Sequence, residues 1–226
     1  MLHLTLLKKQ AVAILKNQEK YLRTAFLLSV VTIVYNLIEG GISIFFGTED
    51  KTLALFGFGV DSFVEVISGL GIAHMVFRMQ RNSIEKRDAF EVTALRVTGV
   101  AFYLLVIGLV VGSVVSFFNK VEPQTTVVGI VISTVSILTM YILYRAKLNV
   151  GKKLNSQPII SDANCTKTCF YLSFILLASS LLYEFFKLPY VDALGSLGIA
   201  YFALKEGREA LELAKSKSLT CSDDCH

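Results

Sequence analysis

The sequence predicts an all-α membrane protein with six transmembrane helices. The chain has 226 residues, of which 54% are hydrophobic and 18% are charged. The apolar residues come in blocks long enough to cross a bilayer core, which takes about 20 residues of helix. Every helical face within these blocks is apolar, whereas the strands of a transmembrane barrel alternate over about 10 residues. We therefore expect a helical bundle rather than a β-barrel.

Six segments carry few or no charges and are interpreted as the spans. They are residues 24–47, 52–77, 97–118, 125–144, 166–186 and 190–204. The connections after the first, third and fifth spans are short, namely "GTEDK", "NKVEPQTT" and "KLP". They leave no room for a folded domain, so chemistry is expected within the membrane or on the side of the longer connections.

Basic residues predict the orientation of the spans. Eighteen Lys and Arg residues lie in the N-terminal stretch, the longer connections and the tail, while the three short connections hold one each. Lys and Arg in short loops stay on the cytoplasmic side, so both termini are expected in the cytoplasm, in a bacterial inner membrane or an equivalent. This count places Lys147 in the connection between the fourth and fifth spans. Because topology accounts for the net charge of +4, we expect no nucleic-acid partner.

The spans divide the chain into three parts, which are an N-terminal segment (1–23), a transmembrane domain (24–205) and a cytoplasmic tail (206–226). In the first part, apolar residues recur near helical spacing with lysines opposite, as in a helix lying on a membrane surface. An ordinary cytoplasmic helical cap is the alternative. Within the spans, Gly108 and Gly112 form a small-xxx-small pair, for which close helix packing is expected.

The second span, "LALFGFGVDSFVEVISG", carries two carboxylates on one helical face. Asp61 and Glu65 are four residues apart. An ionised group at the centre of a span costs roughly 2.5 to 3.5 kcal/mol on insertion scales, and two adjacent carboxylates also repel each other. No Arg or Lys within a span is an obvious partner, since Lys167, the nearest, lies on another face and close to the boundary. A divalent cation or protons are left to neutralise the pair.

The stretch "SDANCTKTC" places two thiols on one face at the start of the fifth span, Cys165 and Cys169. If the second and fifth spans pack together, two carboxylates and two thiolates would enclose one ion. This mixture suits tetrahedral Zn²⁺ or softer Cd²⁺, and suits Mg²⁺ or Ca²⁺ poorly because they prefer six or more oxygens. Cysteines that only fill apolar space are the alternative. We predict the following metal ligands: Asp61, Glu65, Cys165 and Cys169.

Other polar groups predict a path for the ion. Asn36 and Glu39 share one face of the first span, where hydrogen bonding between helices and a role in the path both remain open. Asp162, one turn before Cys165, would attract a cation toward the site. Asp192 opens the sixth span, where helix capping is the main interpretation and a path role is the alternative.

These segments resemble the cation diffusion facilitators, a family of six-span exporters of Zn²⁺ and related divalent ions. "TLALFGFGVDSFVEVISG" looks like the second span of the family, with its [HD]xxxD ligand pair at Asp61 and Glu65. "SDANCTKTC" is similar to the fifth span, in which an aspartate precedes an HxxxD pair by three residues. "YVDALGSLGIAYFALKEGREAL" resembles the sixth span, and "NLIEGG" in the first span also fits. The resemblance covers nearly the whole membrane region and implies a bundle of this kind.

The sequence departs from the family pattern in two ways. Cys165 and Cys169 stand where the family usually has His and Asp, and Glu65 stands where Asp is usual. Two sulfurs favour softer ions, while the carboxylates favour Zn²⁺. The residues after the last span do not resemble the cytoplasmic metal-binding domain that the family usually has, so we expect this domain to be absent. The tail "SLTCSDDCH" is a candidate substitute, with a disordered terminus as the alternative, and its metal ligands would be Cys221, Cys225 and His226.

The expected function is export of a divalent or soft metal cation, with Zn²⁺ and Cd²⁺ as the first candidates. Four deprotonated ligands around a divalent ion leave a net charge of minus two, so metal and protons are expected to exchange by alternating access. We expect no enzymatic activity and no catalytic cofactor; the partners are the metal ion, protons and membrane lipids, and the resemblance implies a homodimer. Two alternatives remain: a membrane metal sensor or regulatory subunit, and a thiol redox protein.

Overall fold

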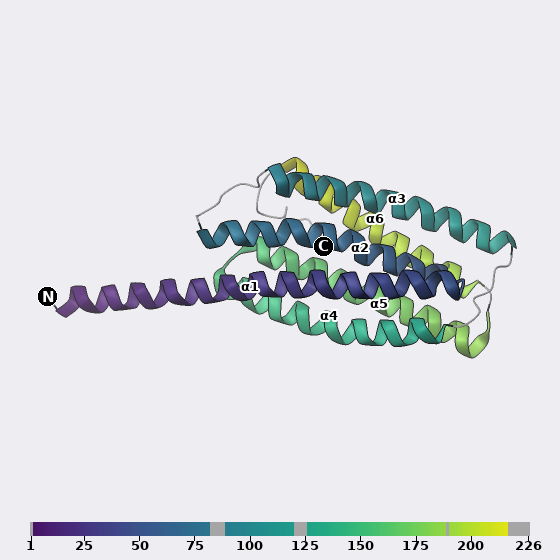
Figure 1. Ribbon diagram of the computed structural model, residues 1–226, viewed down its shortest axis with the longest axis horizontal. Helices are drawn as coiled ribbons and strands as arrows, with labels where there is room; N and C mark the ends of the chain where they lie inside the picture. Colours follow the sequence, from purple (N-terminus) through teal and green to yellow (C-terminus); the bar gives the residue numbers. More distant parts are fainter. Residues whose placement is uncertain (1, 82–88, 120–125, 189, 217–226) are drawn as a thin grey trace.

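The computed structural model describes residues 2–81, 89–119, 126–188 and 190–216, with side chains from residue 18 onward except those of 157, 158 and 161. These residues form six α-helices and no strand (Figure 1). In chain order the helices are α1 (Leu2–Glu49), α2 (Leu53–Arg81), α3 (Ala89–Asn119), α4 (Val127–Leu154), α5 (Gln157–Phe186) and α6 (Val191–Ser216). The predicted six-helix fold is confirmed. The candidate tail site of Cys221, Cys225 and His226 lies outside the described residues.

The helices run side by side along the long axis of the molecule (Figure 1). The most extensive contacts join α1 to α2, α4 to α5, and α3 to α6. Helix α1 is a single helix of 48 residues, so the N-terminal segment and the first span are continuous. At about 1.5 Å per residue it is much longer than a bilayer core of about 30 Å requires. Its N-terminal part projects beyond the other helices in Figure 1.

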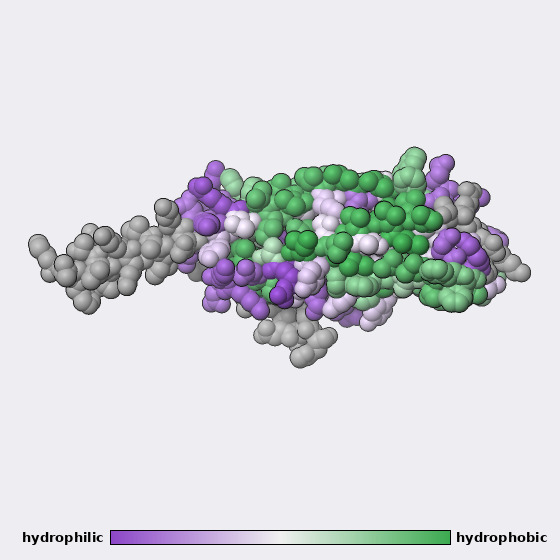
Figure 2. Space-filling model, turned by 90° about the horizontal axis from the view of Figure 1, so that it is seen from below, coloured by the Kyte–Doolittle hydropathy of each residue, from purple (hydrophilic) through white to green (hydrophobic). Residues whose placement is uncertain are grey.

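Five of the described helices, α1 to α5, are long and apolar enough to cross a membrane. Helix α6 does not meet this criterion because its apolar stretch is short and is followed by Lys205, Glu206 and Arg208. It nevertheless packs along α3 as part of the bundle. Large apolar side chains are exposed along α1, α3, α4 and α5, and Figure 2 shows such residues as a broad band between hydrophilic ends. In a membrane this band would face lipid.

Tight turns bring neighbouring helices together. Asn155, between α4 and α5, and Lys187, after α5, both adopt left-handed backbone conformations, with φ of 48° and 49°. Residues at the C-terminal end of a helix commonly adopt this conformation. Near the turn between α1 and α2, a Cβ atom on Gly47 would lie 2.5 Å from the backbone nitrogen of Phe56. Only glycine allows this approach, and the first two helices pack closely because of it.

The main apolar core lies between α2, α3, α5 and α6. Its fully buried members include Leu55, Phe58, Leu109, Leu176 and Ile199. The expected packing of the glycine pair on α3 is only half met. A Cβ on Gly112 would meet the Leu53 side chain at 3.2 Å, whereas a Cβ on Gly108 would meet nothing within 4 Å. Gly108 is exposed and packs against no other helix of the described chain, so the close packing expected there stays a prediction.

Candidate metal site

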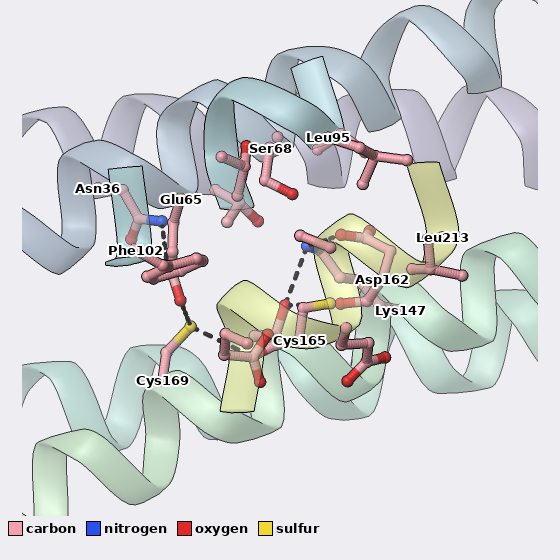
Figure 3. A pocket seen from close by; sticks show the side chains of 18 residues that line it. Asn36, Glu65, Ser68, Leu95, Phe102, Lys147, Asp162, Cys165, Cys169 and Leu213 are labelled. Carbon is pink, nitrogen blue, oxygen red and sulfur yellow. Dashed lines mark hydrogen bonds and ion pairs between the residues drawn. The ribbon is translucent and has the colours of Figure 1, made fainter. Parts of the chain in front are cut away.

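Three helices meet at the carboxylate of Glu65 (Figure 3). The Cys169 thiol of α5 donates a hydrogen bond to Oε1 of this carboxylate. The Asn36 amide of α1 donates from Nδ2 to Oε2, at 2.9 Å. The predicted approach of the second and fifth spans thus occurs, and it places an acid and a thiol in direct contact.

A pocket of about 60 Å³ lies beside this contact. A water molecule needs roughly 10 to 15 Å³ on this measure, so the pocket has room for an ion and a few waters. Its lining comes from the middle of α2, the C-terminal halves of α4 and α6 and the N-terminal halves of α3 and α5, with α1 alongside. The lining groups that ionise or carry sulfur are Glu65, Lys147, Asp162, Cys165, Cys169, Glu206 and Glu209.

The two cysteines differ in burial, and only Cys169 contacts Glu65. Cys169 is buried, and Cys165 is partly exposed in the pocket; both are free thiols. The Cys169 thiol also approaches the backbone oxygen of Cys165, at 3.3 Å, as helical spacing dictates. Cys169 therefore points at Glu65, while Cys165 lies one turn along α5, on the side of Asp162.

Asp61 is buried one turn from Glu65 on α2, but it is not among the residues that line this pocket. Its Oδ1 atom has no hydrogen-bond partner among the described residues. Within the part of the chain that the structure describes, no three side chains of Cys, His, Asp or Glu are arranged to hold a metal ion together. The structure therefore joins Glu65 to Cys169 and leaves the four-ligand set a prediction.

Glu39, the other polar residue predicted on α1, belongs to a second network. Glu39 accepts a hydrogen bond from the Tyr35 hydroxyl at 2.8 Å and one from the Ser62 hydroxyl at 3.3 Å. Because Ser62 follows Asp61 in the chain, this network borders the predicted ligand pair. Helix-to-helix hydrogen bonding, one of the two interpretations of Asn36 and Glu39, is thus present for both residues.

Asp192 is a helix cap, although for a helix distant in sequence. Its carboxylate accepts hydrogen bonds from the backbone nitrogens of Leu53, at 2.8 Å, and Ala54, at 3.2 Å. These nitrogens belong to the first turn of α2, where backbone N–H groups lack partners within the helix. Asp192 therefore joins α6 to the start of α2.

Lys147 does not lie in the connection between two spans, where the charge count had wrongly placed it. Helix α4 continues to Leu154, and Lys147 is buried. Its ammonium donates to Asp162 Oδ1 and Thr166 Oγ1, each at 3.0 Å. The error arose because α4 extends beyond its apolar block, so counting charges could not distinguish a loop lysine from a buried one. Asp162 consequently already pairs with a cation of the protein itself.

Glu206 and Glu209 were also missed as pocket residues. They follow the last predicted span and were assigned to the tail, but α6 continues through them. Their spacing of three residues places both on one helical face, a signal that the sequence did contain. Lys167, considered as a counter-ion, instead lies over the Tyr171 ring at 5.6 Å.

Comparison with known proteins agrees with this architecture. Two relatives are similar over most of the chain. The uncharacterized transporter MJ0449 of Methanocaldococcus jannaschii is 26% identical over 182 residues, which cover 78% of this chain and 63% of the relative. The manganese efflux system protein MneP of Bacillus subtilis is 24% identical over 196 residues, which cover 81% of this chain and 65% of the relative.

The chain thus spans slightly less than two thirds of the length of these relatives. A family model described as the cation efflux transmembrane domain matches residues 25–216, which is nearly all of the bundle. The resemblance stated from the second, fifth and sixth spans is confirmed, and the chain belongs to the cation efflux family.

Proposed function

We propose that this protein exports a soft divalent metal cation, Zn²⁺ or Cd²⁺, in exchange for protons by alternating access. The observation that carries the proposal is the contact between the Cys169 thiol and the Glu65 carboxylate beside an internal pocket. Membership of the cation efflux family supports cation transport in general. The choice of ion and the exchange with protons rest on the chemistry of the site.

The proposed ligands combine hard and soft donors. Asp61 and Glu65 supply carboxylate oxygens from α2, and Cys165 and Cys169 supply thiolates from α5. Thiolates bind Zn²⁺ and Cd²⁺ well, and carboxylate oxygens keep Zn²⁺ competitive. The name of the relative MneP makes Mn²⁺ a third candidate, but Mn²⁺ prefers oxygen ligands, and two thiolates would disfavour it.

The contact itself supports metal and proton exchange. A thiol that donates a hydrogen bond carries its proton, and here that proton lies between the two donors that the metal would need. Metal binding requires the thiolate, so an arriving cation displaces this proton and a departing one allows its return. Export and proton uptake are then two halves of one cycle.

The position of the pocket fits entry from the cytoplasm. Its residues come from the middle of α2 and, in α3 to α6, from the helix halves on the side of the α4–α5 connection. The distribution of basic residues predicts that this side is cytoplasmic. The proposed path includes Glu39, which borders the ligand pair, and Asp162, which acts together with Lys147. We expect the protein to act as a homodimer in a bacterial inner membrane or an equivalent, and crosslinking in native membranes tests this.

The test is flux in liposomes that contain the purified full chain and a pH-sensitive dye. We expect Zn²⁺ and Cd²⁺ to cross with a simultaneous change of internal pH, and we expect Glu65→Gln to abolish both signals. Glu212→Gln, at an exposed position of α6, is the matched control. Mn²⁺, Co²⁺, Ni²⁺, Cu⁺ and Hg²⁺ complete the panel. Binding without flux would indicate a sensor, and flux at constant pH would exclude the exchange with protons.

A further inference from the structure

In the side-chain amide of Asn36, the nitrogen has a hydrogen-bond partner and the oxygen has none. Its Nδ2 donates to Glu65 Oε2 at 2.9 Å. Its Oδ1 is buried and has no hydrogen-bond partner among the described residues. The residue as a whole is 1% exposed. A buried amide oxygen without a donor costs stability, and a bound water or ion would explain such an exception in a polar pocket.

The contacts of Glu65 show which atom of the amide lacks a partner. Nδ2 of Asn36 faces the carboxylate, whose other oxygen accepts from the Cys169 thiol, so Oδ1 is the atom left over. Asn36 also lines the same pocket as Glu65, Cys165 and Cys169, whereas Asp61 does not.

We propose that the amide oxygen of Asn36 is a ligand of the transported cation while the ion lies in this pocket, together with Glu65, Cys165 and Cys169. The inference rests on the proposed function and deepens it, because a donor from α1 takes the place of Asp61 while the ion lies in this pocket, which Asp61 does not line. Amide and carboxylate oxygens are both ordinary metal ligands, and the amide carries no charge.

The neutral donor changes the charge of the loaded site. One carboxylate, two thiolates and a divalent ion sum to minus one, compared with minus two when Asp61 is the fourth ligand. A site nearer to neutrality is less costly to bury. Asn36 would therefore be a specificity-determining residue, because it supplies a fourth ligand to the ion without adding a second carboxylate.

The experiment is a Cd²⁺ titration of the purified full chain. Binding is monitored by the ultraviolet charge-transfer band of Cd²⁺-bound thiolate, called the thiolate band below. We expect Asn36→Leu to weaken Cd²⁺ binding by about tenfold or more, the size of effect that loss of a group at a metal site produces. We expect Asn36→Asp to remain within about threefold of the parent, because a carboxylate oxygen replaces the lost donor. Asn164→Leu, exposed and outside the pocket, is the matched control.

The two Asn36 variants separate ligation from positioning. If Asn36 only held Glu65 through Nδ2, Asn36→Asp would remove that donor and add repulsion, so both variants would lose binding and the inference would be overturned. Parent-like binding by Asn36→Leu would overturn it as well. If Asn36→Leu fails to elute as a folded species in size-exclusion chromatography, Asn36→Asp alone decides, because ligation and positioning predict opposite results for it.

Failure of the proposed function looks different. A parent chain without the thiolate band, or one in which Cys169→Ser leaves the band unchanged, would overturn both the proposed site and the role of Asn36. A parent chain whose band is lost in Cys169→Ser but retained at full affinity in Asn36→Leu would overturn the role of Asn36 alone.

Discussion

Lys147 and Asp162 form an ion pair in the interior of the bundle, with Nζ 3.0 Å from Oδ1 and side-chain exposures of 3% and 11%. The pair lines the pocket that contains both thiols. Thr166 accepts a second hydrogen bond from the same ammonium. The pair therefore ties the C-terminal end of α4 to the turn of α5 that carries Cys165.

Removal of one partner should destabilise the protein strongly. Lys147→Met leaves the Asp162 carboxylate buried and uncompensated, which typically costs about 3 to 5 kcal/mol. We expect a correspondingly lower temperature of unfolding in detergent. The exposed Lys152→Met on the same helix is the control, with an expected change below about 0.5 kcal/mol. The double variant with Asp162→Asn should recover part of the loss; if it is less stable than Lys147→Met, the pair does not explain the effect.

The cap at the start of α2 predicts a graded response at Asp192. Asp192→Ala removes both hydrogen bonds to the first turn of α2, and loss of a cap costs about 0.5 to 2 kcal/mol. Asp192→Asn keeps an oxygen acceptor, so a smaller loss is expected. Unfolding temperatures of both variants, measured side by side, check the order. Equal losses would mean that the negative charge matters rather than the acceptor.

Two glycines offer a matched test of packing. Gly47→Ala would place a Cβ 2.5 Å from the Phe56 backbone nitrogen, and overpacking of this kind typically costs about 1 to 3 kcal/mol. Gly108→Ala meets open space and replaces glycine with a better helix former, worth up to about 1 kcal/mol. We therefore expect opposite shifts of the unfolding temperature. Destabilisation by Gly108→Ala of a single chain in detergent would show that α3 is packed there after all.

The sulfur atoms should set the preference for soft ions. Cys169→Ser replaces a thiolate with a hydroxyl, so Cd²⁺ affinity should fall by at least about tenfold, and Zn²⁺ affinity should fall less because Zn²⁺ accepts oxygen more readily. Competition between the two ions in a binding assay measures the ratio. If the ratio of Cd²⁺ to Zn²⁺ affinity is unchanged in both Cys169→Ser and Cys165→Ser, the thiols are not metal ligands.

The sequence predicted most of the architecture, because apolar blocks of span length leave few alternatives to helices. It also predicted that a carboxylate of the second span would face a thiol of the fifth, since spacing of four residues places each pair on one face. The hydrogen bond between Glu65 and Cys169 joins one member of each pair. The spacing could not predict which carboxylate would contact which thiol, because that depends on how far the two helices are shifted along each other.

Prediction from the sequence was wrong or incomplete in two situations. In one, the interacting residues are far apart in the chain; in the other, a helix extends beyond its apolar segment. The cap by Asp192 joins residues 139 positions apart, and no local pattern encodes such a pairing. Lys147 looked like a loop residue because its apolar block ends at about residue 144. Its burial depends on Asp162, which lies on a different helix and carries no sequence mark of the pairing.

The pairing of Lys147 with Asp162 also bears on how the chain enters its membrane. The two residues are only 15 positions apart, on either side of the turn at Asn155. A lone charge inserted with one helix is costly, but the hairpin of α4 and α5 brings both charges in at once and cancels them. Insertion of these two helices as one unit should therefore cost less than insertion of either helix alone.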